Sequence, residues 1–350
     1  MPESPSSSLR AVLTALRPDQ DDPVSRTSQW ARRALDDGLL DLPLPGRGRT
    51  RERLDLLADL GGVDLDLARL AEAHADAVAI RADLLDPSAE DAGGSRLWGV
   101  WAANPPVDPL RARRDGSDWL LTGTKPWCSG AGCCDQALVT AQTEDGYRLF
   151  STNLHHSGAA PVDGTWPAAA MQGSDSRSVC FDGVPAEAVG GPHDYLTRSG
   201  FWHGAVGVAA VWFGGAREVA RAIARADERR PLKAHALAHA GAVDAALTAA
   251  AAVLSAAAAE FDADPDDRSG TARLTAARVR AVVERTATEV VERTGRALGA
   301  APLALDQAHG RRVADLGLYL RQSHAETDLE GLGRAGLDAG GPPWTGTPSA

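Results

Sequence analysis

The pattern of apolar and polar positions divides the chain into three stretches. From Leu9 to Leu85 the apolar residues recur at helical spacing. Between residues 96 and 190 the pattern changes to short alternating runs, such as "DWLLTG" and "GYRLFST", separated by Gly, Pro and Asp. Helical spacing then returns and continues to about Leu332. The pattern predicts an α+β protein with a β domain inserted between two helical regions.

The limits of these stretches predict a multi-domain organisation. We expect an N-terminal helical domain at residues 1–88 and a middle antiparallel β-barrel or sandwich at residues 89–192. A C-terminal four-helix bundle of up-and-down topology follows at residues 193–335, with a last helix from about Leu305 to Leu332. The Gly- and Pro-rich end of the chain, residues 336–350, is expected to be a disordered tail.

Composition narrows the class of protein. A chain of 350 residues with 44% hydrophobic content can bury a large core. Its net charge of -11 argues against nucleic acid as a partner. The longest apolar stretches are rich in alanine and interrupted by charge or glycine, so we expect no membrane span, no membrane partner and a cytoplasmic location. The four cysteines lack paired metal-ligand spacing, so we expect reduced thiols and no metal site.

The most informative segment is residues 120–132, "LLTGTKPWCSGAG". Asp115-Gly116 before it predicts a hairpin turn, so the segment begins as one strand of a hairpin and opens into a loop. Lys125, Trp127 and Ser129 occupy alternate positions, which would turn their side chains to one side of an extended backbone. An indole with a hydroxyl two residues later suits a flat polar ring system. Such a ring can stack on the indole and hydrogen-bond to the hydroxyl.

This segment resembles the acyl-CoA dehydrogenase superfamily, whose middle domain carries a Gly-x-Lys-x-Trp-x-Thr/Ser motif that packs the flavin ring. The matching residues here are Gly123, Lys125, Trp127 and Ser129. The resemblance extends through "SRSVCFDGVP" at the end of the β stretch and "FWHGAVGVAAVWFGGAREVA" after it. It implies an oxidoreductase with a flavin cofactor, expected to be FAD with FMN as the alternative, whose ring lies against Trp127 while Ser129 bonds to its edge.

Further cofactor contacts are implied by the same resemblance. The run "LWGVWAA" stands where the family has its first flavin-contacting strand, which assigns ring contacts to Trp98, Val100 and Trp101. Trp101 departs from the family, because a small hydroxyl residue is common there. Arg229 or Arg230 would contact the dinucleotide part of FAD. In the family that part is held across a dimer, so the resemblance implies a homodimer or homotetramer.

The catalytic base expected of a dehydrogenase is missing at both usual positions. The reaction needs a carboxylate to remove an α-proton. The family supplies it near the last helix or on the first bundle helix, and these positions align with Ser323 and Thr197. The remaining candidates are Glu326, one turn after Ser323, and His324, which would face the inner side of a continuous last helix. Glu72 and His74 on an N-terminal helix are further positions near the family's substrate cavity.

Three functions remain open at this point. The first is oxidation of an acyl thioester or similar small molecule, with acyl-CoA as the model substrate and a relocated or absent base. The second is a flavin-dependent monooxygenase of the same fold, which would use histidine and serine, here His324, Ser323 and His203. The third is a non-catalytic member that keeps the scaffold for binding or assembly.

Overall fold

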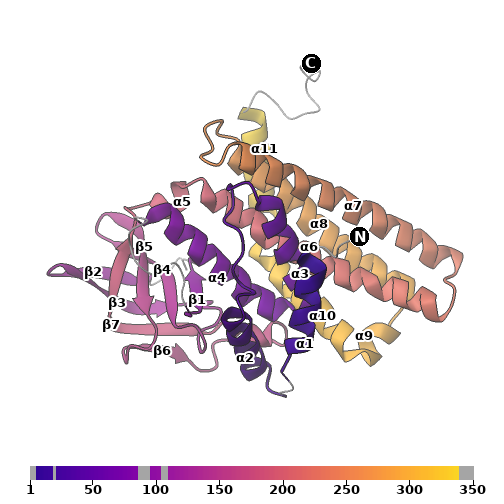
Figure 1. Ribbon diagram of the computed structural model, residues 1–350, viewed down its shortest axis with the longest axis horizontal. Helices are drawn as coiled ribbons and strands as arrows, with labels where there is room; N and C mark the ends of the chain where they lie inside the picture. The colour runs from indigo at the N-terminus through magenta and orange to yellow at the C-terminus, as the bar shows by residue number, and fades with distance from the viewer. Residues whose placement is uncertain (1–4, 19–20, 86–94, 104–108, 339–350) are drawn as a thin grey trace. The chain divides into compact units, whose positions relative to one another are not determined.

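The computed structural model describes residues 5–18, 21–85, 95–103 and 109–338 (Figure 1). Helices precede and follow a region of strands, as the sequence pattern predicts. The N-terminal helices are α1 (Pro5–Leu16), α2 (Pro23–Asp36), α3 (Thr50–Val63) and α4 (Leu65–Leu84). The strands are β1 (Trp98–Trp101), β2 (Arg111–Asp115), β3 (Asp118–Lys125), β4 (Gln136–Thr143), β5 (Gly146–Asn153), β6 (Ala159–Val162) and β7 (Ser178–Val189). The C-terminal helices are α5 (Asp194–Thr197), α6 (Gly200–Arg229), α7 (Ala234–Ala263), α8 (Ala272–Leu298), α9 (Ala301–Leu305), α10 (Gln307–Tyr319) and α11 (Glu326–Asp338), with 3-10 turns η1 (Gln172–Ser174) and η2 (Leu320–Gln322).

The chain forms two compact units. Unit 1 comprises residues 1–44 and 59–201, and unit 2 comprises residues 45–58 and 202–350. Unit 1 therefore holds the strands with helices α1, α2, α4 and α5, whereas unit 2 holds the long C-terminal helices. Helix α3 contributes residues to both. The three domain boundaries expected from the sequence stay predictions. The tail was expected from residue 336, but α11 continues to Asp338, and residues 339–350 lie outside the described part of the chain.

The strands of unit 1 form one seven-stranded sheet whose pairings close a ring. In this ring β4 pairs with β2 and β5, β5 and β3 both pair with β7, and β3 pairs with β2. Strand β6 is added antiparallel to β7, and β1 runs parallel to β4. The sheet is therefore mostly antiparallel, as expected from the sequence, but both β1 and β2 pair with β4 in parallel. Alternation of apolar and polar residues identifies a strand but does not encode the direction of its partner.

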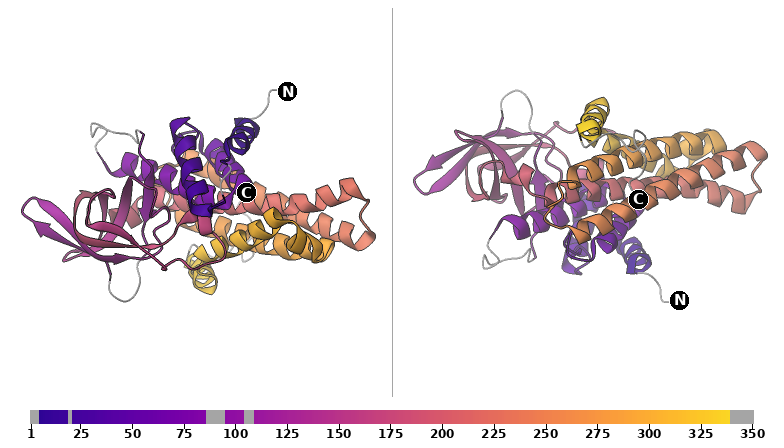
Figure 2. Two further views of the ribbon diagram at one scale, coloured as in Figure 1. Left: turned by 90° about the horizontal axis from the view of Figure 1, so that it is seen from below. Right: turned by 90° about the horizontal axis from the view of Figure 1, so that it is seen from above.

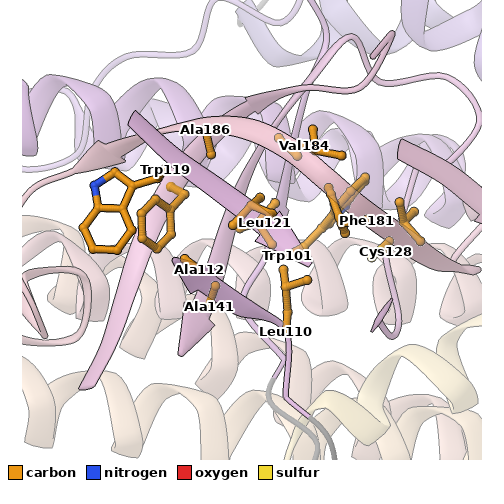
Figure 3. Packing of buried hydrophobic residues seen from close by; sticks show 14 of the residues in the cluster. Trp101, Leu110, Ala112, Trp119, Leu121, Cys128, Ala141, Phe181, Val184 and Ala186 are labelled. Carbon is orange, nitrogen blue, oxygen red and sulfur yellow. The ribbon is translucent and has the colours of Figure 1, made fainter. Parts of the chain in front are cut away.

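The interior of the ring is packed with large side chains (Figure 3). Trp101 and Phe181 meet edge to face with ring centroids 6.5 Å apart, and Leu121 lies in the same cluster. A second aromatic pair joins Trp119 to Phe150 at 5.2 Å. The predicted hairpin is confirmed, since Asp115 pairs with Asp118 across a turn in which Gly116 has a φ of +61°.

Helix α4 covers the ring at strand β1. The Asp64 carboxylate caps α4 by accepting from the amides of Asp66 and Leu67. The helix is buried over most of its length, and its Ala77 and Ile80 pack with Trp98 of β1. A helix that is buried on more than one side has apolar residues on several faces and a weak amphipathic pattern. The many alanine and leucine residues of α4 fit this environment.

Unit 2 consists mainly of long helices, and α6, α7 and α8 run alongside one another in both views of Figure 2. The loop before α3 is held to the end of α7 by the Asp262 carboxylate. This group accepts from the amides of Gly48 (2.9 Å) and Thr50 (3.1 Å) and from the Thr50 hydroxyl (2.6 Å). Asp262 thus satisfies the first amide of α3 from another helix, which complements the positive end of the helix dipole.

The last helix is not continuous, contrary to expectation. Helix α10 passes into the 3-10 turn η2, and Ser323 then adopts an extended conformation with φ -77° and ψ 132°. A new helix, α11, begins at Glu326, after Ala325 with a φ of +47°. The Asp328 carboxylate accepts from the His324 amide at 2.9 Å and so holds the break. The apolar spacing from Val313 to Leu320 cannot reveal a break that a carboxylate two turns later stabilises.

Helix α7 is the most apolar helix among the residues that the structure describes. It contains an 18-residue window of mean hydropathy 1.7, so by length and composition alone it could cross a membrane. Only 28% of that window is buried in the structure. One such helix is weak evidence for a membrane span, so the expected absence of a span stays a prediction.

Candidate functional site

Two loops of unit 1 are joined edge to edge by backbone hydrogen bonds. The first, residues 126–132, follows β3, and the second, residues 171–177, precedes β7. The amides of Cys128, Gly130 and Ala131 donate to the carbonyls of Arg177, Ser174 and Asp175, respectively. The Gly132 amide donates to the Asp175 carboxylate at 2.8 Å. These bonds fix the shape of the loop pair, although neither loop is part of a β-strand.

Backbone strain is concentrated in this loop pair. Six non-glycine residues of the described part of the chain have a positive φ, and three of them lie here: Trp127 at +56°, Met171 at +52° and Asp175 at +42°. Such conformations cost on the order of 1–3 kcal/mol each and persist only where the surroundings enforce them. Clusters of strained residues are typical of ligand sites, so the loop pair is the strongest candidate site in unit 1.

Trp127 is unusual for its exposure. Its side chain is 60% exposed although it is a large aromatic group, whereas Trp98 and Trp101 are buried. The left-handed backbone at Trp127 also breaks the alternation expected from the sequence. Lys125 and Ser129 are buried while the indole is exposed, and the extended backbone on which the predicted alternation depends is absent at Trp127. An indole presented in this way offers an apolar face on which a flat ring can stack.

Lys125 anchors the start of the first loop. Its ammonium donates to the carbonyl (2.7 Å) and to the hydroxyl (2.8 Å) of Thr140 on β4. Burial lowers the pKa of Lys125 to about 8. The lysine of the motif thus joins β3 to β4 inside the ring, and its role in the structure is to position the loop that carries Trp127.

Ser129 begins a chain of three buried hydroxyls. Ser174 Oγ donates to the Met171 carbonyl at 2.7 Å, which uses its single proton. Ser176 must therefore donate to Ser174 across their 2.9 Å contact, and Ser129 must donate to Ser176 across 2.8 Å. The order of the bonds thus leaves Ser129 Oγ only its lone pairs. Toward any further group, Ser129 acts as a hydrogen-bond acceptor.

Three of these supporting residues were missed by sequence analysis, although they hold the second loop. Asp66 of α4 is fully buried, and its carboxylate accepts from the Ser174 amide at 3.0 Å. Asp175 pairs with Arg177 at 2.6 Å and accepts from Gly132. Ser176 lies within the matched family run but carried no motif signal of its own. No signal in the sequence links positions that are more than 100 residues apart, as Asp66 and Ser174 are.

The predicted contacts on β1 lie inside unit 1. Trp101 is 1% exposed, and its Nε1 donates to the Ser129 carbonyl at 3.0 Å. Trp98 is buried against α4 and receives the Arg81 guanidinium over its ring at 4.4 Å. Val100 between them is half-buried. The structure therefore connects Trp101 directly to the Ser129 loop, whereas Trp98 packs toward the N-terminal helix.

His74 is a buried neutral residue. The Trp98 amide approaches its Nδ1 at 3.3 Å, which requires an unprotonated acceptor nitrogen there. Burial lowers the pKa of His74 to about 4. Glu72, two residues earlier in the helix, is buried and pairs with Arg69 at 2.6 Å. His74 thus joins α4 to β1, and Glu72 forms an ion pair within α4.

The catalytic candidates of unit 2 lie at the break between α10 and α11. His324 is 77% exposed and pairs with Asp328 at 3.4 Å, so it is not on an inner helix face as expected. Glu326 is exposed in the first turn of α11, and Ser323 is half-buried. Their assignment as catalytic residues stays a prediction.

The other residues named for unit 2 are spread along its helices. Arg229 is exposed in the last turn of α6. His203 near the start of α6 is buried and packs on Phe261, with ring centroids 4.2 Å apart. Thr197, at the other position aligned with a catalytic base, belongs to unit 1 and is exposed at the end of α5. Within the described ranges, no group of three or more His, Cys, Asp or Glu side chains could hold a metal ion.

Comparisons with known proteins support the fold. Neither a protein-family model nor a curated protein sequence matches the chain. Among solved structures, a dibenzothiophene monooxygenase from Paenibacillus sp. A11-2, determined with FMN and indole, is 20% identical with a TM-score of 0.79, over 95% of this chain and 96% of that one. A methanesulfinate monooxygenase from Pseudomonas fluorescens is 19% identical with a TM-score of 0.81, over 97% and 98%.

A third structure is similar to the same extent. The KijD3 protein, determined with FMN and a dTDP-linked amino-keto sugar, is 20% identical with a TM-score of 0.77, over 97% of this chain and 95% of that one. At this identity the likeness concerns the fold, and it extends over nearly the full length of each protein. The chain therefore has the fold of the acyl-CoA dehydrogenase-like flavoenzymes.

Proposed function

We propose that this protein is a flavin-dependent monooxygenase that takes reduced FMN and oxidises a small organic molecule. The observation that carries the proposal is the exposed indole of Trp127, held at φ +56° on a loop pair whose backbone is hydrogen-bonded along its length. A strained backbone costs stability, and such strain clusters at sites that bind ligands. Solved proteins of the same fold bind FMN, which supports a flavin as the flat partner.

The residues of the loop pair fit a flavin ring. Trp127 would stack on the ring, and Trp101 would hold the Ser129 backbone in place through its bond to the Ser129 carbonyl. Lys125 would keep the loop in register with β4. When bound in its reduced form, the flavin supplies the electrons that activate dioxygen.

Ser129 supports the reduced form of the cofactor. Its proton is committed to Ser176, so its oxygen is complementary to a ring edge that presents an N–H group. A reduced flavin carries a proton on the ring nitrogen that is an unprotonated acceptor in the oxidised form. The relay would therefore favour reduced over oxidised flavin, which suits an enzyme that receives its cofactor already reduced.

The absence of acid at two aligned positions supports oxygen chemistry over dehydrogenation. Thr197 and Ser323 stand where the resembled dehydrogenases have a glutamate, and neither hydroxyl is a competent base near neutral pH. Glu326 is exposed on α11, where its carboxylate is solvated. A monooxygenase does not need to abstract an α-proton. The missing glutamate is therefore compatible with this chemistry.

The proposal replaces FAD by FMN as the favoured cofactor and leaves acyl-CoA as one candidate substrate among small molecules. The FMN-bound structures of similar fold support the first change. Arg229 as a contact to the dinucleotide part of FAD, homo-oligomeric assembly and a cytoplasmic location stay predictions from the sequence.

Flavin binding and oxygen use test the proposal directly. We expect purified protein to bind FMN, and reduced FMN to drive substrate-dependent oxygen consumption when a panel of aromatic, sulfur-containing and sugar-nucleotide compounds is supplied. Trp127→Ala should weaken FMN binding by roughly tenfold, because loss of a stacked aromatic contact removes about 1.4 kcal/mol. Leu305→Ala, a change at another exposed apolar residue, should leave FMN binding unchanged.

Two results would overturn this function. Anaerobic bleaching of bound flavin by acyl-CoA, without any need for oxygen, would establish dehydrogenation instead. A protein that binds neither FMN nor FAD in calorimetry would mean that the loop pair serves packing or assembly, as in a non-catalytic member of the fold.

A further inference from the structure

A surface pocket of unit 1 contains two adjacent cysteines. The pocket has a volume of about 860 Å³ and lies beside α2, where Arg32 and Arg33 line one wall and the turn at residues 131–135 lines another. Cys133 and Cys134 both border it. We propose that Cys133 is a covalent modification site, at which its thiolate forms a mixed disulfide with a low-molecular-weight disulfide that enters this pocket.

The turn places both sulfur atoms on one side. The amides of Cys133 and Cys134 both donate to the Gly130 carbonyl, at 3.0 and 2.9 Å. A Cβ atom on Gly130 would lie 2.6 Å from Cys134 Sγ and 3.5 Å from Cys133 Sγ. Side chains of adjacent residues in an extended strand point to opposite sides, so the convergence of these sulfurs is a property of the turn. Gly130 leaves the space that they occupy.

The two thiols have opposite character. Cys134 is buried, and burial together with its bond to Cys133 raises the pKa of its thiol, so Cys134 stays protonated and can donate. A hydrogen bond from Cys134 lowers the pKa of the Cys133 thiol, with further help from Ser28 and the charge of Arg32, against the opposing effect of burial. A partly exposed thiol whose thiolate is stabilised in this way is typical of a reactive cysteine.

The charges around Cys133 come from several elements. Helix α2 contributes Arg32, Arg33 and Asp36, its C-cap is Asp37, and the loop after β5 contributes His155. Asp175 lies close enough to oppose ionisation of Cys133. Asp135 is bound on both carboxylate oxygens by Arg32, at 2.7 and 3.0 Å, so much of its charge is neutralised. Arg32 Nη2 also donates to the Cys133 carbonyl at 3.3 Å, which holds its positive charge near the sulfur.

A disulfide between the two cysteines is disfavoured by geometry. Neighbouring Cα atoms across a trans peptide are about 3.8 Å apart, shorter than the roughly 4.4–6.8 Å of ordinary disulfides. An external disulfide avoids this strain. The Cys133 thiolate attacks one sulfur of R–S–S–R, a new Cys133–S bond forms, and the old S–S bond breaks. The second thiol leaves as a thiolate with the electron pair and takes a proton from water.

Competition between two thiols of the same molecule provides the test. Cys180 on β7 is the exposed cysteine, so access alone predicts that it reacts first. The full chain is treated briefly with hydroxyethyl disulfide at pH 7, and the adducts are located by peptide mass spectrometry. We expect labelling at Cys133 at least about threefold faster than at Cys180, because the gain in thiolate exceeds the accompanying loss of nucleophilicity. Faster labelling at Cys180, or equal rates, would overturn the proposal.

Variants separate the role of each sulfur. Cys133→Ser should abolish the pocket adduct, and Cys180→Ala should leave the Cys133 rate unchanged. Cys134→Ala should move the pH midpoint of the Cys133 reaction upward, whereas Cys134→Ser, which keeps a donor, should restore it at least partly. An unshifted pH profile in folded Cys134→Ala would remove Cys134 from the proposal. If this variant does not fold, the wild-type comparison between Cys133 and Cys180 still decides.

Discussion

At the scale of single residues, protonation of His74 links stability to pH. The folded pKa is lowered from 6.5 to about 4, so the unfolded chain binds a proton in this window that the folded chain does not. Above about pH 6.5, protonation of His74 has almost no effect on the free energy of unfolding. As the pH decreases toward 4, this free energy falls. Between about pH 7.5 and 5 the loss should reach about 2 kcal/mol, read from urea unfolding.

The variant His74→Gln isolates this effect. It keeps a polar group that can accept from the Trp98 amide but does not titrate. Its unfolding free energy should therefore depend less on pH than that of the wild type, even though His309, whose pKa is also lowered by burial, still titrates. An unchanged slope would mean that the pKa of His74 is the same in the folded and the unfolded state.

The serine relay makes a second prediction at the residue scale. Ser176→Ala removes the acceptor of the Ser129 proton, so Ser129 becomes free to donate to oxidised flavin. We expect wild type to bind reduced FMN more tightly than oxidised FMN, and the ratio to fall by roughly threefold to tenfold in the variant. Anaerobic titration measures both constants.

A control for the relay lies in the β2–β3 turn. Ser117→Ala changes an exposed serine whose hydroxyl bonds Asp118, in the hairpin turn and outside both loops. Its ratio of affinities should match that of the wild type. A Ser176→Ala ratio equal to that of Ser117→Ala would show that the direction of the relay does not reach the cofactor.

At the scale of elements, the contact between Asp262 and the start of α3 should carry measurable stability. Asp262→Ala removes the acceptor of two amides and one hydroxyl, which should cost about 1–3 kcal/mol in the free energy of unfolding. Asp266→Ala, in the turn that follows α7, is a matched control, since Asp266 is exposed and pairs only with exposed Arg268 among the described contacts. It should change stability by less than about 0.5 kcal/mol. Equal losses in urea unfolding would contradict the capping role.

At the scale of the whole molecule, cofactor binding should stabilise the fold. A ligand that binds only the folded state adds about 2.7 kcal/mol at a concentration 100 times its dissociation constant. We therefore expect FMN to raise the melting temperature of the full chain in proportion to the logarithm of its concentration. Trp127→Ala should need about ten times more FMN for the same shift. A melting temperature that FMN does not change would contradict the flavin site.

Much of the architecture could be predicted from the sequence. The helix, strand, helix order follows from local periodicity, and the hairpin at Gly116 follows from turn chemistry. The candidate site was predicted in part. Trp127 and Ser129 were identified by their motif, but the extended backbone expected there was wrong. Trp127 has a left-handed backbone in a loop whose Cys128 and Gly130 amides donate to the carbonyls of Arg177 and Ser174.

Tertiary structure decided the features that depend on distant residues. The break at Ser323 is held by Asp328, the second loop by Asp66, and the direction of the hydroxyl relay by the Met171 carbonyl. Sequence by itself determined where the chain forms helices and strands and which residue types are available, because propensity and periodicity are local. The exposure of Trp127, the acceptor role of Ser129 and the convergence of Cys133 and Cys134 arise from contacts that exist only after the chain has folded.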